Sequence, residues 1–131
     1  QNFRFLPYQE KSVLPYSLTA CDVSLVSVAE GMESLVAPSK LYPAMAAGRP
    51  IAAICPQSSY LGPLLKAAGG GQAFKNGDVS AVADYIRYLS QHKAEARKLG
   101  ESGRQYMQSH FTLKQISSQY LDVLTTAPAT K

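Results

Sequence analysis

The chain has 131 residues, of which 46% are hydrophobic and 17% are charged. This length suits a single domain that buries its own apolar core without disulfides or a metal ion. Thirteen basic residues against nine acidic ones give a net charge of +4. That excess is too diffuse for a typical nucleic-acid-binding protein, so we expect no nucleic acid as a partner.

The two cysteines, Cys21 and Cys55, lie in apolar stretches without a CxxC pattern or a neighbouring histidine. We therefore expect reduced, buried thiols in a cytoplasmic protein and no metal site. No apolar run in the sequence is long enough to cross a membrane. The chain begins at Gln1 rather than with Met, which suggests a fragment.

The first 38 residues alternate between strand-like and helix-like segments. Residues 2–6 alternate polar and apolar side chains and predict a short strand. Residues 12–20 predict a short helix with Pro15 in its first turn. Residues 22–28 are apolar and β-rich enough to form a central strand, which a loop over residues 29–38 follows.

The next segments continue this alternation. Ser39 is expected to cap a helix that runs to about Ala47, and residues 50–54 predict a strand buried on both faces. Ser58 or Ser59 is expected to cap the following helix.

That helix ends at the glycine run 69–71, which we interpret as a C-cap. Residues 72–74 predict an edge strand before a turn at 76–77, and Asp78 is expected to cap the next helix, which runs to about residue 91.

The C-terminal part is predicted to be helical throughout. A helix over residues 93–109 contains Gly100 and Gly103, each of which costs about 1 kcal/mol relative to Ala. Their presence indicates that backbone packs closely there. Thr112 and Gln115 predict a capping box at the start of a last helix.

The apolar face of the last helix needs a partner surface, so we expect a homodimer or a tendency to aggregate. This face comprises Ile116, Tyr120, Val123 and Leu124. Residues 127–131 are expected to form a disordered tail.

Strands that alternate with helices every twenty to thirty residues predict an α/β fold. We expect a Rossmann-like parallel sheet flanked by helices and ending in a run of helices. About four strands can be counted, whereas a doubly wound nucleotide-binding domain usually has about five or six. The first βα units are therefore expected to be missing.

Open α/β sheets bind ligands at the carboxyl ends of their strands, and two loops qualify, over residues 6–9 and 29–38. The second loop runs into the helix expected at Ser39, where free amides and the charge of Lys40 would suit a phosphate. The alternative interpretation is an ordinary N-cap followed by a solvated lysine.

Two carboxylates in the same loop, Glu30 and Glu33, would repel a phosphate. We therefore expect them to face neutral hydroxyls, such as those of a sugar.

Several runs in this order resemble the donor-binding region of retaining glycosyltransferases of family 4, also called group 1, which have the GT-B fold. They are residues 20–31, Pro-Ser-Lys-Leu-Tyr at 38–42, Met-Ala-Ala-Gly-Arg-Pro-Ile at 45–51, Asn-Gly-Asp at 76–78 and His-Phe-Thr at 110–112. The resemblance covers nearly the whole chain. It implies that residues 1–126 are the later part of the C-terminal, nucleotide-sugar-binding half of a transferase.

Such an enzyme moves a sugar from a nucleotide diphosphate to a saccharide or lipid-linked acceptor in polysaccharide biosynthesis. The resemblance implies no cofactor, with the nucleotide sugar as substrate. It also implies that this domain works together with the protein's own N-terminal acceptor domain. Contact with a membrane would be peripheral and would involve only that missing half. The fragment alone is expected to be inactive.

The resemblance also assigns residues to the site. Glu30 would hold sugar hydroxyls, and the turn at Ser39 would lie beneath the phosphates and ribose. The donor-binding set is Glu30, Gly31, Met32, Glu33, Ser39, Lys40 and Leu41. The base-contacting set is Leu6, Pro7 and Tyr8.

One position departs from the family pattern. The second glutamate of the family's Glu-x7-Glu signature, which grips the ribose, falls on Pro43. This proline removes a carboxylate and, in a helix that begins after Ser39, also an intrahelical N–H. Two alternatives therefore stay open: a non-catalytic Rossmann-like assembly module, and a GT-B nucleotide-sugar epimerase.

Overall fold

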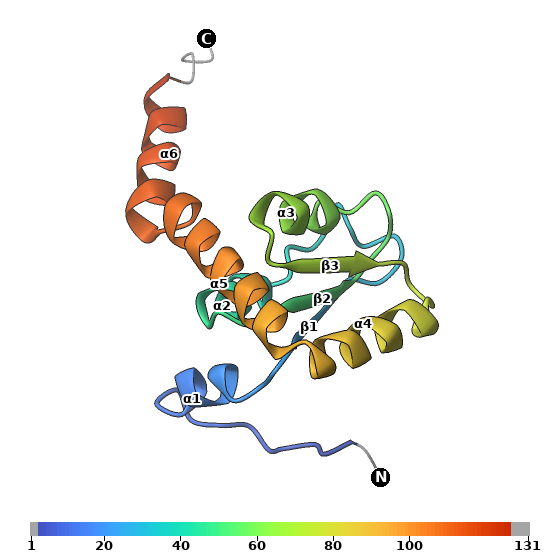
Figure 1. Ribbon diagram of the computed structural model, residues 1–131. Helices are drawn as coiled ribbons and strands as arrows, with labels where there is room; N and C mark the ends of the chain where they lie inside the picture. The colour runs from blue at the N-terminus through green and yellow to red at the C-terminus, as the bar shows by residue number, and fades with distance from the viewer. Residues whose placement is uncertain (1–2, 127–131) are drawn as a thin grey trace.

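Three short strands form a fully parallel sheet in the order β1-β2-β3 (Figure 1). They are β1 (Ser24–Ser27), β2 (Ile51–Ile54) and β3 (Gly71–Phe74). This computed structural model describes residues 3–126, so the expected tail over 127–131 lies outside the described residues. The helices are α1 (Leu14–Thr19), α2 (Leu41–Ala46), α3 (Leu61–Ala68), α4 (Val79–Gln91), α5 (Lys93–His110) and α6 (Leu113–Thr126).

The core lies on one face of this sheet. Side chains alternate along each strand, so Val26 of β1 shares a face with Ile51 and Ala53 of β2. Helices α2 and α3 cover that face through Met45, Leu65 and other apolar side chains. The α/β class with a parallel sheet flanked by helices is therefore confirmed.

The opposite face is covered less completely. Phe74 of β3 packs against Tyr85 of α4, with ring centroids 5.3 Å apart. At the other edge of the sheet, Leu25 of β1 stays 56% exposed.

The prediction of a strand over residues 2–6 is wrong for residues 3–6, which the structure describes. Residues 3–10 hold no strand, and Phe3, Phe5 and Leu6 are all exposed. A strand requires a neighbour to take its backbone hydrogen bonds, and this segment runs below α1, away from the sheet (Figure 1). Three strands are thus present among the described residues, where four were expected.

The prediction that Ser39 caps α2 is also wrong. The helix begins at Leu41, and Lys40 occupies the cap position without a side-chain cap bond. The Leu41 amide instead donates to the carbonyl of Pro38 at 3.1 Å. Pro43 is consequently the third residue of α2, where the N–H has no intrahelical acceptor, so the proline removes a carboxylate but no helix hydrogen bond.

The two ends of α3 lie close to where the sequence predicts them. Gly69 ends α3 in the left-handed conformation, which confirms the C-cap. Tyr60 rather than a serine occupies the N-cap of α3, yet the Ser59 hydroxyl accepts a hydrogen bond from the Leu61 amide at 3.3 Å.

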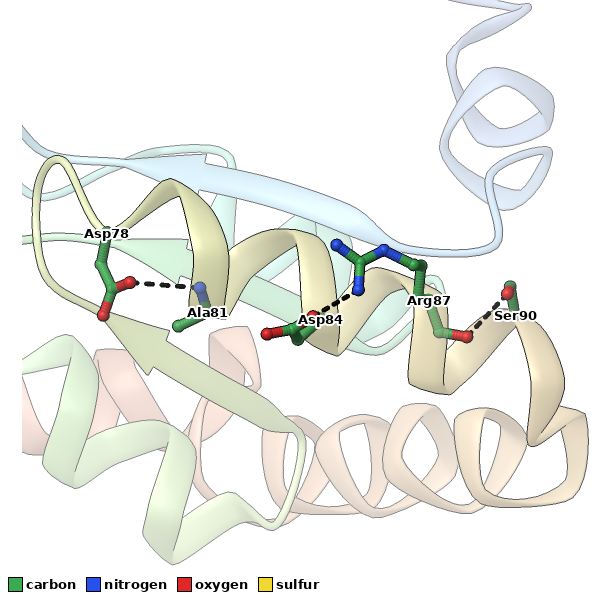
Figure 2. Close-up of polar contacts among 5 residues, drawn as sticks. All are labelled: Asp78, Ala81, Asp84, Arg87 and Ser90. Carbon is green, nitrogen blue, oxygen red and sulfur yellow. Dashed lines mark hydrogen bonds and ion pairs between the residues drawn. The ribbon is translucent and has the colours of Figure 1, made fainter.

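Helix α4 confirms its predicted start. Asp78 accepts a hydrogen bond from the Ala81 amide at 3.1 Å (Figure 2). Further along the same helix, Arg87 pairs with Asp84, and the Ser90 hydroxyl donates to the Arg87 carbonyl at 2.7 Å.

The close approach expected around the glycines of α5 is confirmed. A Cβ added at Gly100 would lie 2.1 Å from the carbonyl oxygen of Gly48, which follows α2. Gly103 lies against Gly70, where an added Cβ would meet the Gly70 Cα at 3.2 Å. These two contacts let α5 lie directly on the turns that lead into β2 and β3.

The capping box of α6 is present, since the Thr112 amide donates to Gln115 Oε1 at 3.0 Å and the Gln115 amide to Thr112 Oγ1 at 3.4 Å. Helix α6 projects away from the sheet (Figure 1), and its apolar side chains are exposed except for Ile116, which is half-buried. Self-association through this face stays a prediction. Among residues 3–126, none of the helices is both long and apolar enough to cross a bilayer.

Candidate functional site

Three loops meet at the carboxyl edge of the sheet, where open α/β sheets bind their ligands. Residues 28–40 follow β1, residues 55–60 follow β2, and residues 75–78 follow β3. Backbone hydrogen bonds extend the strand pairing into these loops: the Val28 amide donates to the Ile54 carbonyl at 2.9 Å. Parallel pairing therefore fixes the start of each loop relative to its neighbour.

Two side chains tie the loops together. The Ser58 hydroxyl donates to Glu33 Oε1 at 2.9 Å, which joins the loops after β1 and β2. The Asn76 side chain donates to the Val28 carbonyl at 3.2 Å, which joins the loops after β1 and β3. Sequence reasoning placed Ser58 in a helix cap and Asn76 in a turn and missed both contacts. The available signal was their position directly after buried strands.

Glu33 is the better positioned of the two carboxylates in the first loop. Its side chain is partly buried, and its second oxygen, Oε2, is shielded from solvent and has no hydrogen-bond partner within residues 3–126. Hydrogen bonds from its own backbone amide and from the Ser58 hydroxyl hold the pKa of Glu33 below its ordinary value, against the smaller effect of burial. The group is therefore an ionised hydrogen-bond acceptor, and a hydroxyl donor would reach its second oxygen once the loop opens.

Glu30, Gly31 and Met32 occupy the exposed tip of the same loop. Gly31 adopts a left-handed conformation with φ of 76°, and no atom lies within 4 Å of the position where a Cβ would be. The backbone is thus open to a ligand here. The Met32 amide closes a turn by donating to the Ala29 carbonyl at 3.1 Å.

The turn at Ser39, which was predicted to lie beneath the phosphates, differs in part from the expected arrangement. Ser39 and Lys40 are exposed at the end of the loop, whereas the Leu41 side chain is fully buried in the core. The Leu41 amide is occupied by Pro38, and α2 has only six residues. Because a helix this short has a small dipole, the positive charge at this end of the loop comes mainly from Lys40.

The predicted base-contacting residues do not follow a strand of the sheet. Leu6 is 64% exposed and Tyr8 is fully exposed, and the Pro7 carbonyl accepts a hydrogen bond from the Gln9 side chain at 2.8 Å. The structure does not bring this segment to the loops at the carboxyl edge (Figure 1). In the described part of the chain, no three His, Cys, Asp or Glu side chains cluster to hold a metal ion.

Comparison with known proteins identifies the kind of molecule to which this segment is related. Over 110 residues the chain is 33% identical to the probable glycosyltransferase WbjE of Pseudomonas aeruginosa. The chain is homologous to part of this probable glycosyltransferase. The alignment covers 84% of this chain and 26% of WbjE. No family profile matches the sequence.

The fold has a counterpart among solved structures. It superposes on part of the sucrose-phosphate synthase of Thermosynechococcus elongatus with a TM-score of 0.71 at 22% identity, covering 95% of this chain and 31% of that one. The likeness confirms the expected fold, a parallel sheet flanked by helices similar to part of a GT-B glycosyltransferase. The chain spans about a quarter of WbjE and about a third of the synthase.

Proposed function

We propose that this chain forms the later part of the nucleotide-sugar-binding half of a retaining glycosyltransferase of family 4. The observation that carries the proposal is Glu33, an ionised carboxylate at the carboxyl edge of the sheet with one unpartnered oxygen. An acceptor of this kind suits a sugar hydroxyl and does not suit a phosphate. The homology to WbjE supports the same class of reaction.

In this proposal the two ends of the loop after β1 bind different parts of the donor. Glu33, together with the exposed Glu30, accepts hydrogen bonds from hydroxyls of the donor sugar. The exposed backbone at Gly31 lets the donor approach closely, and Met32 lies beside it. At the other end, the positive charge of Lys40 stabilises the diphosphate as it leaves.

The turn at Ser39 lies beneath the phosphates and ribose in this proposal, while the buried Leu41 supports it from the core side rather than by touching the donor. The segment at Leu6, Pro7 and Tyr8 contacts the base only if it moves to the carboxyl edge. The reaction uses no metal ion or other cofactor. The acceptor binds to a separate N-terminal half, so the 131-residue chain alone is inactive.

Pro43 favours a second candidate, a non-catalytic assembly module. It stands where the family has the glutamate that grips the ribose, and the structure places it in the first turn of α2. A protein that lost this carboxylate through relaxed selection would keep the sheet and lose donor binding.

Charge-removing variants separate the two candidates. In a longer protein that contains this chain, Glu33→Gln and Lys40→Ala should each lower sugar transfer by about tenfold or more, the loss expected for a charged hydrogen bond or a charge at the reacting phosphates. Glu10→Gln and Lys66→Ala make the same changes at exposed positions outside the loop and should leave transfer unchanged.

Donor binding is measured by isothermal titration with UDP and GDP sugars. Failure of the folded longer protein to bind any nucleotide sugar would overturn the proposal. Silent Glu33→Gln and Lys40→Ala variants would favour the assembly module. A free, epimerised sugar as product would instead identify an epimerase.

A further inference from the structure

A hollow lies at the amino edge of the sheet, opposite the candidate site. It encloses about 530 Å³, which falls within the range of small-ligand pockets, roughly 300–1,000 Å³. Its walls are the residues that lead into β1 and β2, namely Asp22 and residues 47–50, together with one side of α5. This hollow is separate from the loops that carry Glu33 and Lys40.

Four cationic side chains line this amino-edge hollow. Lys93, Arg97 and Arg104 come from α5, where spacings of four and seven residues place them on one side of the helix. Arg49 comes from the turn between α2 and β2. Two segments far apart in the sequence therefore direct positive charge into one space.

The positive charge exceeds the negative charge available to neutralise it. Lys93 pairs with Asp22 at 3.4 Å, and Glu101 is the other acid that lines the hollow. Within residues 3–126, Arg97 and Arg104 form no ion pair, although Glu101 lies four residues after Arg97 on the same helix.

Arg49 is the member of this set that is fixed in place. Its guanidinium donates from Nη2 to the carbonyl of Thr19 at the end of α1, and the side chain is partly buried. Its Nε is shielded from solvent and has no partner among the described residues. The guanidinium is therefore held at the wall of the hollow, where its positive charge would attract an anion.

We propose that the amino-edge hollow binds a phosphate group, held by the guanidinium groups of Arg49, Arg97 and Arg104. Guanidinium is the side-chain group that best matches the oxygens of phosphate, because its planar N–H donors can pair with two oxygens at once. The polar lining suits a phosphorylated small molecule or the phosphate of a lipid headgroup. This site is independent of the proposed function, which uses the other edge of the sheet.

The test titrates the ¹⁵N-labelled chain with inorganic pyrophosphate and follows amide and arginine Nε–Hε shifts by NMR. Saturable shifts are expected at Gly48, Arg49 and the hollow side of α5. The double variant Arg97→Gln/Arg104→Gln should weaken binding by about tenfold or more, since it removes two charges beside the anion. Both arginines are exposed, so the fold should be unchanged.

Lys98→Gln provides the matched control. Lys98 lies on α5 next to Arg97, is exposed and does not line the hollow. Its loss should change pyrophosphate affinity by less than about twofold, as expected for a screened surface charge. Equal weakening by the control and by the double variant would show attraction to overall charge and would overturn the site.

Vesicles distinguish the two sources of the phosphate. Co-sedimentation with phosphatidylcholine vesicles that contain phosphatidic acid, lost in the double variant and kept in Lys98→Gln, assigns the site to a lipid headgroup. Pyrophosphate binding without vesicle binding assigns it to a soluble ligand. Binding in neither assay overturns the proposal.

Discussion

Replacing Gly100 with Ala tests whether backbone contact between α5 and the end of α2 holds the fold together. The added Cβ would lie 2.1 Å from the Gly48 carbonyl oxygen and 2.7 Å from its carbon, and real Cβ contacts essentially never fall below 3.0 Å. The overlap of about 1 Å is with backbone atoms, so no side-chain rotation relieves it. Helix α5 must therefore move away from the turn at Gly48.

Two opposing effects determine how much Gly100→Ala changes the free energy of unfolding. Overpacking a core contact lowers the free energy of unfolding by up to about 3 kcal/mol. We use this upper value because the overlap is between backbone atoms. Replacing a mid-helix glycine with alanine recovers about 1 kcal/mol of helix propensity. Gly100→Ala should thus lower the free energy of unfolding by about 2 kcal/mol, or the Tm by roughly 6–10 °C.

Urea unfolding followed by circular dichroism measures this change, and Gly62→Ala serves as the matched control. Gly62 also lies in a helix, but its added Cβ would meet nothing closer than Ala73 Cβ at 3.8 Å. Because Pro63 follows and disfavours helical backbone at the preceding residue, the net effect should stay within about 0.5 kcal/mol. A Gly100→Ala protein as stable as Gly62→Ala would refute the close contact.

Three further changes test other parts of the structure. Asp78→Ala removes the cap bond to the Ala81 amide and should cost about 1 kcal/mol in urea unfolding. Burial raises the pKa of Tyr85 to about 12, from an ordinary 10.0. As the pH rises, the unfolded chain therefore loses this proton before the folded chain does. The contribution of Tyr85 to the free energy of unfolding is complete below about pH 10 and is lost as the pH rises towards 12. Tyr85→Phe should remove this part of the loss of stability at high pH. Ser58→Ala should raise the pKa of Glu33 towards its ordinary value in a ¹³C NMR titration, and only in part, because the largest lowering comes from the backbone.

Each of these changes has a conservative comparison. Asp78→Asn keeps a cap acceptor and should cost much less than the alanine variant. Tyr88→Phe alters an exposed tyrosine of the same helix, and a high-pH effect equal to that of Tyr85→Phe would contradict the role of burial. Ser58→Thr keeps the hydroxyl, so a Glu33 pKa that moves as far as in the alanine variant would rule out the hydrogen bond.

The sequence by itself determined the elements whose signals are local. The apolar runs of β1 and β2, the Asp78 cap and the capping box at Thr112 depend on residues a few positions apart, and each lies where the pattern predicts it. The two glycines inside α5 also indicated close packing, because nothing else compensates for their cost in a helix.

Tertiary structure decided the features that require two distant segments. Residues 3–6 carry a strand pattern but form no strand, because pairing needs a neighbour with free backbone groups. Helix α2 starts at Leu41 rather than after Ser39, since burial of the Leu41 side chain and the Pro38 turn outweigh the serine's preference for the cap.

The candidate sites divide in the same way. The loop from Glu30 to Lys40 could be selected from the sequence, because it follows a buried strand and carries charge. The bond from Ser58 to Glu33 spans 25 positions, and Arg49 meets the α5 arginines across about fifty. No local pattern encodes such distances: only packing of the helices onto the parallel sheet determines which charged groups share one space.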